Sequence, residues 1–305
     1  MKNVTVAATQ MKSRGFDRAA NIQAAEQLVR KAAAQGAQII LIQELFQTDY
    51  FCQKMLDQNM KLALPLAEDP AVRHFQQVAR ELDVVLPISF FEKDNQAHYN
   101  SLAVIDADGT LLGVYRKSHI PDGAGYSEKF YFNIGDTGFR VWKTKYATIG
   151  CGICWDQWYP EAARILALKG AELLFYPTAI GSEPDEDPSA FDSMPHWRTV
   201  MQGHAGANLT PVIASNRIGT EHCEDYQITF YGSSFIADGH GQLVRQMDRE
   251  TEGIVTATFD LDALALARRA WGVFRDRRPD LYAPLLTQDG ATPFLKEAGI
   301  RTGNG

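Results

Sequence analysis

A cysteine that could act as a nucleophile lies within residues 147–170 of this 305-residue chain. Residues 149–153 form a short apolar run with glycine at alternate positions, which predicts a buried strand. Pro160 suits the first turn of a following helix, and Gly170 marks the end of that helix. Cys154 therefore falls in the turn between a strand and a helix. A substrate can reach a thiol there, and nearby backbone N–H groups can favour its thiolate.

Two charged residues at predicted strand ends could assist this thiol. Glu44 follows the apolar strand 37–43, and Lys117 follows the strand 111–116. Ligands of α/β proteins tend to bind outside the carboxyl ends of strands. A buried Glu44 could accept the thiol proton, while Lys117 would stabilise a developing oxyanion. Taken singly, Glu44 could equally cap a loop, Lys117 could be a surface lysine and Cys154 a core residue.

A histidine is the usual alternative to a carboxylate as the base for a cysteine nucleophile. The chain has seven histidines, of which only His119 lies near a predicted strand end beside the other candidates. A pair formed by Cys154 and His119 therefore stays open as a second arrangement, although no further feature of the sequence supports it. Replacement of His119 distinguishes this arrangement from one with Glu44 as the base.

The elements that must position these residues predict an α/β fold. Apolar runs and helical periodicity alternate along the chain, and Asp-Gly turns at 108–109 and 238–239 indicate two β-hairpins. Two hairpin-containing sheets covered by helices imply a layered sandwich rather than one doubly wound sheet. The predicted strands are 4–9, 37–43, 84–91, 100–105, 111–116, 149–153, 172–176, 211–215, 234–237, 243–245 and 253–260, and the main helices are 18–35, 70–82, 196–208 and 261–270.

No linker divides the chain, so we expect one domain over residues 1–305. Residues 178–195 are acidic and proline-rich without an apolar period, which predicts a long loop. The C-terminal residues 271–305 are expected to be extended, with enough apolar side chains to pack at a subunit interface.

Composition limits the class of protein. Hydrophobic residues make up 45% of the chain and charged residues 22%, as in a typical globular enzyme. The net charge of −7 argues against a nucleic-acid partner and mildly favours cationic ligands. No apolar run is long enough to span a membrane, and the four cysteines show neither a disulfide framework nor zinc-ligand spacing. A cytoplasmic location fits best.

The motifs QELF at Glu44, YRKSHIP at Lys117 and CGICWDQWYPEAAR at Cys154 resemble the nitrilase superfamily of carbon-nitrogen hydrolases. The resemblance runs from the first strand to RRPDLY and implies a Glu-Lys-Cys triad in a four-layer α-β-β-α sandwich. It also implies that Glu128 orients Lys117 or the substrate, and that the backbone N–H of Trp155 joins Lys117 in binding the oxyanion. The resemblance further implies that the enzyme needs no metal or cofactor and forms a homo-oligomer.

Longer segments, among them YPTAIGSEP, MQGHAGAN and WGVFRDRRPDLY, resemble the branch that hydrolyses the cationic ureide N-carbamoylputrescine in putrescine biosynthesis. Trp158 stands where many members of the superfamily carry an arginine, which agrees with this branch. The substrate ends in an ammonium about four methylenes from the reacting group, so its pocket needs an apolar sleeve and a distant acid. Asp122 and Glu183 are the candidate acids, and the candidates for the sleeve are Tyr126, Trp155 and Trp158.

Three other functions remain open. A ureidopropionase-type hydrolase and an ω-amidase share the fold, but both predict a basic residue for the carboxylate of the substrate. A catalytically silent scaffold is the third alternative. It would need none of the residues Glu44, Lys117 and Cys154, which this chain carries together.

Overall fold

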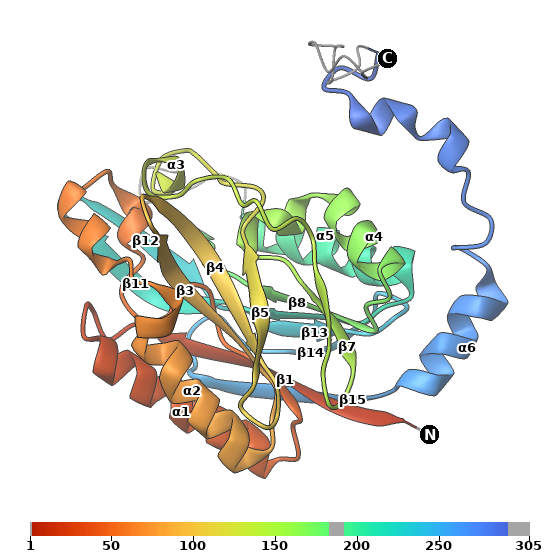
Figure 1. Cartoon of the computed structure of the whole chain (residues 1–305), viewed down its shortest axis with the longest axis horizontal. Coiled ribbons are helices and arrows are strands. Elements are labelled where there is room, and N and C mark those ends of the chain that lie inside the picture. The colour runs from red at the N-terminus through yellow and green to blue at the C-terminus, as the bar shows by residue number, and fades with distance from the viewer. Residues whose placement is uncertain (1, 183–191, 292–305) are drawn as a thin grey trace, which may run out of the picture.

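The computed structural model describes residues 2–182 and 192–291 of the chain (Figure 1). Its first sheet is built around β1, which pairs antiparallel with β15 and parallel with β2. A parallel bridge between Ile39 and Val85 continues this sheet into the antiparallel strands β3, β4 and β5. Because β2, β3 and β5 run in the same direction, β2 and β5 end at the same edge. The strands are β15 (Gly253–Asp260), β1 (Asn3–Lys12), β2 (Ile39–Leu41), β3 (Leu86–Asp94), β4 (Ala97–Ile105) and β5 (Leu111–Arg116).

The second sheet has the strand order β14-β13-β10-β8-β7-β6. Its centre is parallel: β7 pairs with β8 and β8 with β10, and the helices α4 and α5 form the crossovers between them. The bounds are β14 (Leu243–Gln246), β13 (Phe235–Ala237), β10 (Val212–Ser215), β8 (Leu173–Pro177), β7 (Thr148–Cys151) and β6 (Val141–Lys143).

Four layers result from the alternation of side chains along the strands. In β2, Ile39 and Leu41 belong to the core between the sheets, whereas Ile40 packs with the side chains of α1 and α2 on the outer face. The helices α4 and α5 cover the second sheet in the same way. Figure 1 shows this stacking, which confirms the predicted α-β-β-α sandwich. The covering helices are α1 (Arg18–Ala34), α2 (Pro70–Leu82), α4 (Pro160–Leu168) and α5 (Ser193–Asn208).

The strand β6 and one further hairpin were not predicted from the sequence. The strands of this hairpin, β11 (Arg217–Cys223) and β12 (Tyr226–Tyr231), pair antiparallel. The start of β11 pairs parallel with the end of β1, at Met11 and Lys12. The buried residues of β11 include Arg217 and Glu221, so the strand lacks the apolar run that identifies the others.

The segment 178–195, predicted as a loop, is partly regular in its described portion. The short strand β9 (Gly181–Ser182) pairs with β12, and α5 begins at Ser193 rather than at the predicted residue 196. Asp192 caps this helix by accepting from the N–H of Met194, which explains the earlier start. The remaining short elements are α3 (Glu128–Tyr131), η1 (Phe51–Gln53), η2 (Asp57–Leu62), η3 (Leu66–Glu68) and η4 (Cys154–Trp158).

After α6 (Leu261–Trp271) the C-terminal segment runs past α4, where the guanidinium of Arg164 lies over the ring of Phe274 (Figure 1). The described residues of this tail contain two short 3-10 helices, η5 (Pro279–Leu281) and η6 (Ala283–Leu286), and are otherwise irregular. Proline occupies the first turn of each, where its fixed φ favours a helical turn. Leu286 is 76% exposed. A subunit contact here stays a prediction, and residues 292–305 lie outside the described part.

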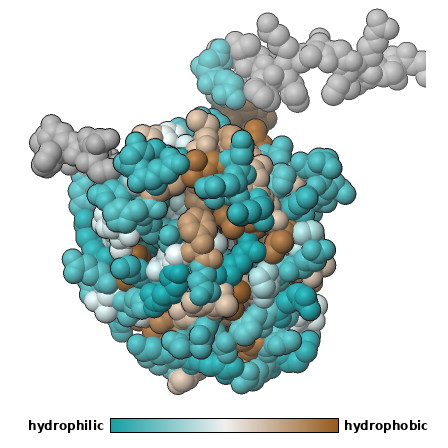
Figure 2. Space-filling view, turned by 90° about the vertical axis from the view of Figure 1, so that its left-hand side faces the viewer, coloured by the Kyte–Doolittle hydropathy of each residue, from teal (hydrophilic) through white to brown (hydrophobic). Residues whose placement is uncertain are grey.

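The surface is largely hydrophilic on the side shown in Figure 2, where hydrophobic residues form a smaller group among polar ones. Within residues 2–182 and 192–291, no helix is long and apolar enough to cross a membrane.

Candidate active site

The structure places Cys154 three residues after the end of β7, as the first residue of η4. Its φ of +41° lies in the left-handed region, which is costly for a residue with a side chain and is often found at functional sites. The Sγ atom lies 3.8 Å from the carbonyl oxygen of Ala179, to which the thiol donates. Burial and the charge of Glu44 raise the pKa of this thiol well above its ordinary value, although Lys117 opposes them. Burial thus opposes the thiolate that nearby backbone N–H groups were expected to favour.

Asp156 holds the turn that carries the cysteine. One carboxylate oxygen accepts from the N–H of Ile153 at 2.9 Å and from the hydroxyl of Tyr115 at 2.7 Å. The other accepts from the backbone N–H of His119 at 3.0 Å and from its Nδ1 at 2.7 Å. Because Tyr115 and His119 flank Lys117, this buried carboxylate joins the segment that carries the lysine to the segment that carries the thiol. The sequence analysis did not identify Asp156.

The contacts of His119 argue against a role as the base. Its ring stacks on Tyr159 with a centroid separation of 3.6 Å, and its Nδ1 is bonded to Asp156. Within the described residues no hydrogen bond joins His119 to Cys154. The ring therefore fixes the loop after β5.

Lys117 follows the last residue of β5 and is fully buried. Its Nζ donates to Oε1 of Glu44 at 2.8 Å and to Oε2 of Glu128 at 2.7 Å. Burial alone would lower the pKa of this amine, but the charges of Glu128 and Glu44 outweigh it and raise the pKa well above its ordinary value. The lysine is therefore a fixed positive charge. The alternative of a surface lysine is wrong.

Glu44 lies beyond the end of β2, at the same sheet edge as Lys117, and is fully buried. Its Oε1 also accepts from the amide of Asn100 at 2.7 Å, and its backbone N–H donates to Thr178, the neighbour of Ala179. Within the described residues its Oε2 has no hydrogen-bond partner. This oxygen is free to take up a proton, which a loop-capping carboxylate would not be.

Glu128 begins α3 and is buried beside Lys117. The hydroxyl of Tyr50 donates to its Oε1 at 2.6 Å. Burial raises the pKa of Glu128 to about 6, although the charge of Lys117 opposes the rise. Asn100 and Tyr50, which orient the two glutamates, were missed in the sequence because neither residue type suggests a role until its partner is known.

The three aromatic residues predicted to bind the substrate have different surroundings. The hydroxyl of Tyr126 accepts from the N–H of Gly181 at 3.0 Å, which ties the loop before α3 to β9. Trp155 is 37% exposed, and its backbone N–H, in the first turn of η4, has no acceptor within that helix. Trp158 packs against the α4–α5 layer, with its ring 4.9 Å from that of His196. Its ring also meets that of Trp155 edge to face at a centroid separation of 6.2 Å, and a role for Trp158 in the sleeve stays a prediction.

Of the two candidate acids for the substrate ammonium, the structure describes only Asp122. Asp122 is exposed on the loop after Lys117 and forms no ion pair within the described part of the chain. Glu183 lies outside the described residues.

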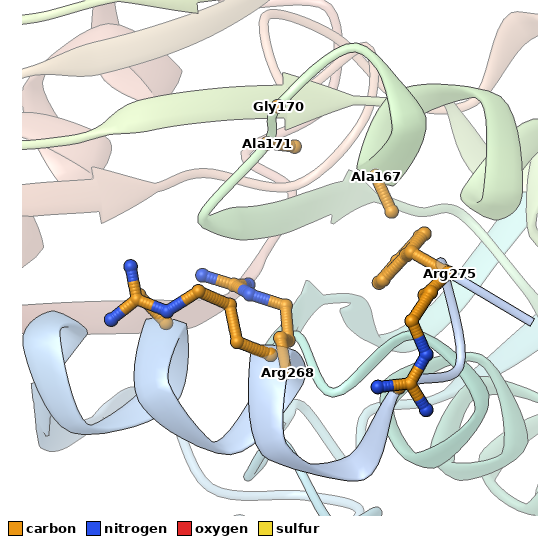
Figure 3. Close-up of a pocket in the computed structure, with 9 residues that line it drawn as sticks. Ala167, Gly170, Ala171, Arg268 and Arg275 are labelled. Carbon is orange, nitrogen blue, oxygen red and sulfur yellow. The ribbon is translucent and has the colours of Figure 1, made fainter.

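A cavity elsewhere does not fit this chemistry. It measures about 530 Å³ and lies between the end of α4 and α6 (Figure 3). Arg268 and Arg275 line it together with small apolar residues, and it contains neither a nucleophile nor a carboxylate. No cluster of three or more His, Cys, Asp or Glu side chains in the described residues could hold a metal ion.

Comparisons with known proteins identify the family of the chain. The sequence model of the carbon-nitrogen hydrolase family matches residues 5–269. An N-carbamoylputrescine amidase from Arabidopsis thaliana is 60% identical over 278 residues, which cover 90% of this chain and 92% of that protein. A citrullinase from Francisella tularensis is 53% identical over 282 residues, covering 92% and 98%. The solved carbon-nitrogen hydrolase from Helicobacter pylori G27 superposes with a TM-score of 0.89 at 38% identity, covering 94% and 99%.

Proposed function

Because this chain belongs to the carbon-nitrogen hydrolase family, also called the nitrilase superfamily, we propose that it hydrolyses N-carbamoylputrescine to putrescine, ammonia and carbon dioxide. The observation that carries the chemistry is the buried contact of Lys117 with Glu44 beside the thiol of Cys154. The substrate is supported by the 60% identity to the Arabidopsis amidase.

The first step transfers the thiol proton of Cys154 to the free Oε2 of Glu44. The sulfur then bonds to the ureido carbon, and the electrons of the C=O bond move to the oxygen. A base assists this step because burial raises the pKa of the thiol and so favours its protonated form. Lys117 and the backbone N–H of Trp155 stabilise the oxyanion, and loss of one such donor typically costs about 2.7–4 kcal/mol in the barrier.

The tetrahedral adduct collapses when the C–N bond breaks, and Glu44 gives its proton to the departing nitrogen. Loss of either nitrogen leaves a thiocarbamate on Cys154. Glu44 then deprotonates a water molecule, whose oxygen displaces the thiolate, and the thiolate recovers a proton. The resulting carbamate separates into an amine and carbon dioxide, so one urea group and one water yield two amines and carbon dioxide.

Charge in the site favours a cationic substrate. Lys117 is flanked by two carboxylates, Glu44 and Glu128, so the three groups carry a net charge of −1 when all are ionised. We infer that Asp122 or Glu183 binds the distant ammonium. Trp155, Tyr126 and Trp158 would cover the methylene chain, with a cation–π contribution near its end.

Citrulline is the second candidate, because the Francisella relative at 53% identity is a citrullinase. It carries the same ureido group but places a carboxylate beside its ammonium. A site for citrulline therefore needs a cation for that carboxylate as well as an acid.

The test is ammonia release from N-carbamoylputrescine, citrulline and N-carbamoyl-β-alanine by purified protein in reducing buffer, with Cys154→Ala as the background. We expect turnover of the first compound to exceed that of the other two by at least about 100-fold, the effect of leaving one charge unpaired. Preference for citrulline would assign the second function. Preference for N-carbamoyl-β-alanine would exclude Asp122 and Glu183 as specificity residues.

A further inference from the structure

The guanidinium of Arg217 contacts the turn that carries Glu44. Arg217 is the first residue of β11 and is fully buried. Its Nε and Nη2 lie 3.3 and 3.2 Å from the carbonyl oxygen of Glu44. Nη2 also donates to the carbonyl oxygens of Leu45 and, at 3.0 Å, Thr48. One side chain thus binds three backbone carbonyls of a single turn.

Glu221 forms an ion pair with this guanidinium. Its Oε1 accepts from Nη1 of Arg217 at 2.7 Å, and its Oε2 accepts from the backbone N–H of Tyr50. The residue between the two on the same face of β11 is Gly219, so no side chain separates them. Tyr50 in turn donates to Glu128. The buried ion pair therefore contacts the segment that carries Glu44, and it reaches Glu128 only through the side chain of Tyr50.

The turn itself needs this support. Leu45 has a φ of +47°, which is unfavourable for a leucine, and its N–H donates to Ser89 at 2.9 Å. The carbonyls of Glu44, Leu45 and Thr48 converge on one buried point, where each would lack a donor without Arg217. A guanidinium can serve all three and a carboxylate at once because its donors are spread in a planar fork, which a lysine cannot reproduce.

We propose that Arg217, held in place by Glu221, is a positioning residue that fixes the backbone of Glu44 so that its free Oε2 meets the thiol of Cys154. The proposal rests on the function proposed above, in which Glu44 is the base. It predicts that changes at Arg217 act on proton transfer and leave substrate binding largely intact.

The test compares Arg217→Met, which keeps the bulk of the side chain, with Arg217→Lys, which keeps its charge. The control is Val29→Ala, which removes buried packing between α1 and the first sheet, away from the site. The measurements are kcat, KM, the melting temperature and the rate of alkylation of Cys154 by iodoacetamide, followed on the Cys154 peptide by mass spectrometry between pH 5 and 9. Alkylation needs no ureide, so it reports on the thiol even if the proposed substrate is wrong.

For Arg217→Met we expect kcat and the alkylation rate at neutral pH to fall about 100-fold, as for a catalytic group displaced by about 1 Å. KM should change less than about threefold, and Arg217→Lys should recover about a tenth of the wild-type rate, since it keeps the charge but not the fork. Val29→Ala should keep kcat within about twofold at a comparable loss of melting temperature, since its cavity lies outside the site.

Equal kcat in Arg217→Met and Val29→Ala at matched melting temperature would overturn the proposal, as would an unchanged pH profile of alkylation in Arg217→Met. If Arg217→Met does not fold, Glu221→Gln decides. It leaves the guanidinium without its counter-charge, and an alkylation rate equal to wild type would reject the positioning role. Normal alkylation together with no turnover of any ureide in the wild type would instead reject the proposed substrate alone.

Discussion

The Nζ of Lys117 lies 2.7 Å from Oε2 of Glu128, and both groups are buried. The same amine contacts Glu44, so one cation neutralises only one of two adjacent carboxylates. The excess negative charge is the reason that Glu44 contributes to the raised pKa of Glu128, after burial itself. The network therefore changes its charge near pH 6, within the range in which an enzyme is assayed.

Activity should rise with pH through about 6. Below that pH Glu128 becomes protonated, because burial raises its pKa to about 6, and the charge balance around Lys117 is then altered. We expect kcat/KM to show an acidic limb with a midpoint near pH 6. Glu128→Gln should lose that limb and retain at most about 1% of the activity, by analogy with the removal of an oxyanion-stabilising group. An unchanged limb in this variant would assign it to another group.

The contribution of Glu128 to stability should have the opposite sign. Its ordinary pKa is 4.5, so the folded protein holds the proton more tightly than the unfolded chain does. The stabilisation is complete below pH 4.5 and is lost as the pH rises through about 6, with a value of about 2 kcal/mol. Urea unfolding at several pH values between 4.5 and 7 measures it. Glu128→Gln should show a smaller decline over this window, and an equal decline would contradict the assignment.

Cys154→Ser should lower kcat by about 10³-fold or more, because a hydroxyl is much harder to deprotonate than a thiol and a lost nucleophile leaves only the binding terms. The melting temperature should change by no more than a few degrees, since the two side chains differ little in size. Steady-state kinetics and thermal unfolding give both values. Substantial turnover by the serine variant would exclude the thiocarbamate mechanism.

His119→Ala should keep kcat within about threefold, because the ring stacks on Tyr159 and no hydrogen bond joins it to Cys154 in the described residues. The free energy of unfolding should fall by about 1–3 kcal/mol, since buried Asp156 loses a charge-assisted donor. Kinetics and urea unfolding of the same preparation separate the two effects. A loss of activity as large as that of Cys154→Ser would restore the Cys–His arrangement.

Asp122→Asn should raise KM for N-carbamoylputrescine about tenfold, the effect expected of a charged hydrogen bond that becomes neutral. N-Butylurea has the same ureido group and chain but no ammonium, so its KM should change little. Initial rates over a range of both substrates give the ratio. Equal effects on the two compounds would remove Asp122 from the ammonium site and leave Glu183 as the candidate.

The sequence was sufficient to predict where Glu44, Lys117 and Cys154 lie, because each follows a strand with a clear apolar run. The direction of those strands brings β2 and β5 to one edge, and the buried contact of Lys117 with Glu44 spans 73 residues. Asn100, Tyr50 and Asp156 could not be predicted. Their roles depend on partners up to 78 residues away, and an asparagine, a tyrosine or an aspartate in isolation indicates no particular contact.

The hairpin β11–β12 was missed for a related reason. A strand is identified in a sequence by apolar residues on its buried face, whereas β11 buries Arg217 and Glu221 there. Those charges are stable inside the protein only because they pair with each other and with backbone groups of distant turns. The buried charges that make β11 hard to recognise in the sequence are thus the groups that connect it to the site.

The raised pKa of the Cys154 thiol also bears on how the enzyme survives oxidants. Peroxides react with thiolates far faster than with thiols, and over-oxidation of a nucleophilic cysteine to the sulfinic acid is irreversible. A thiol that is buried and protonated at rest is a poor target for them. In the proposed mechanism the thiolate forms only when Glu44 takes the proton of Cys154, so the resting enzyme presents little thiolate to an oxidant.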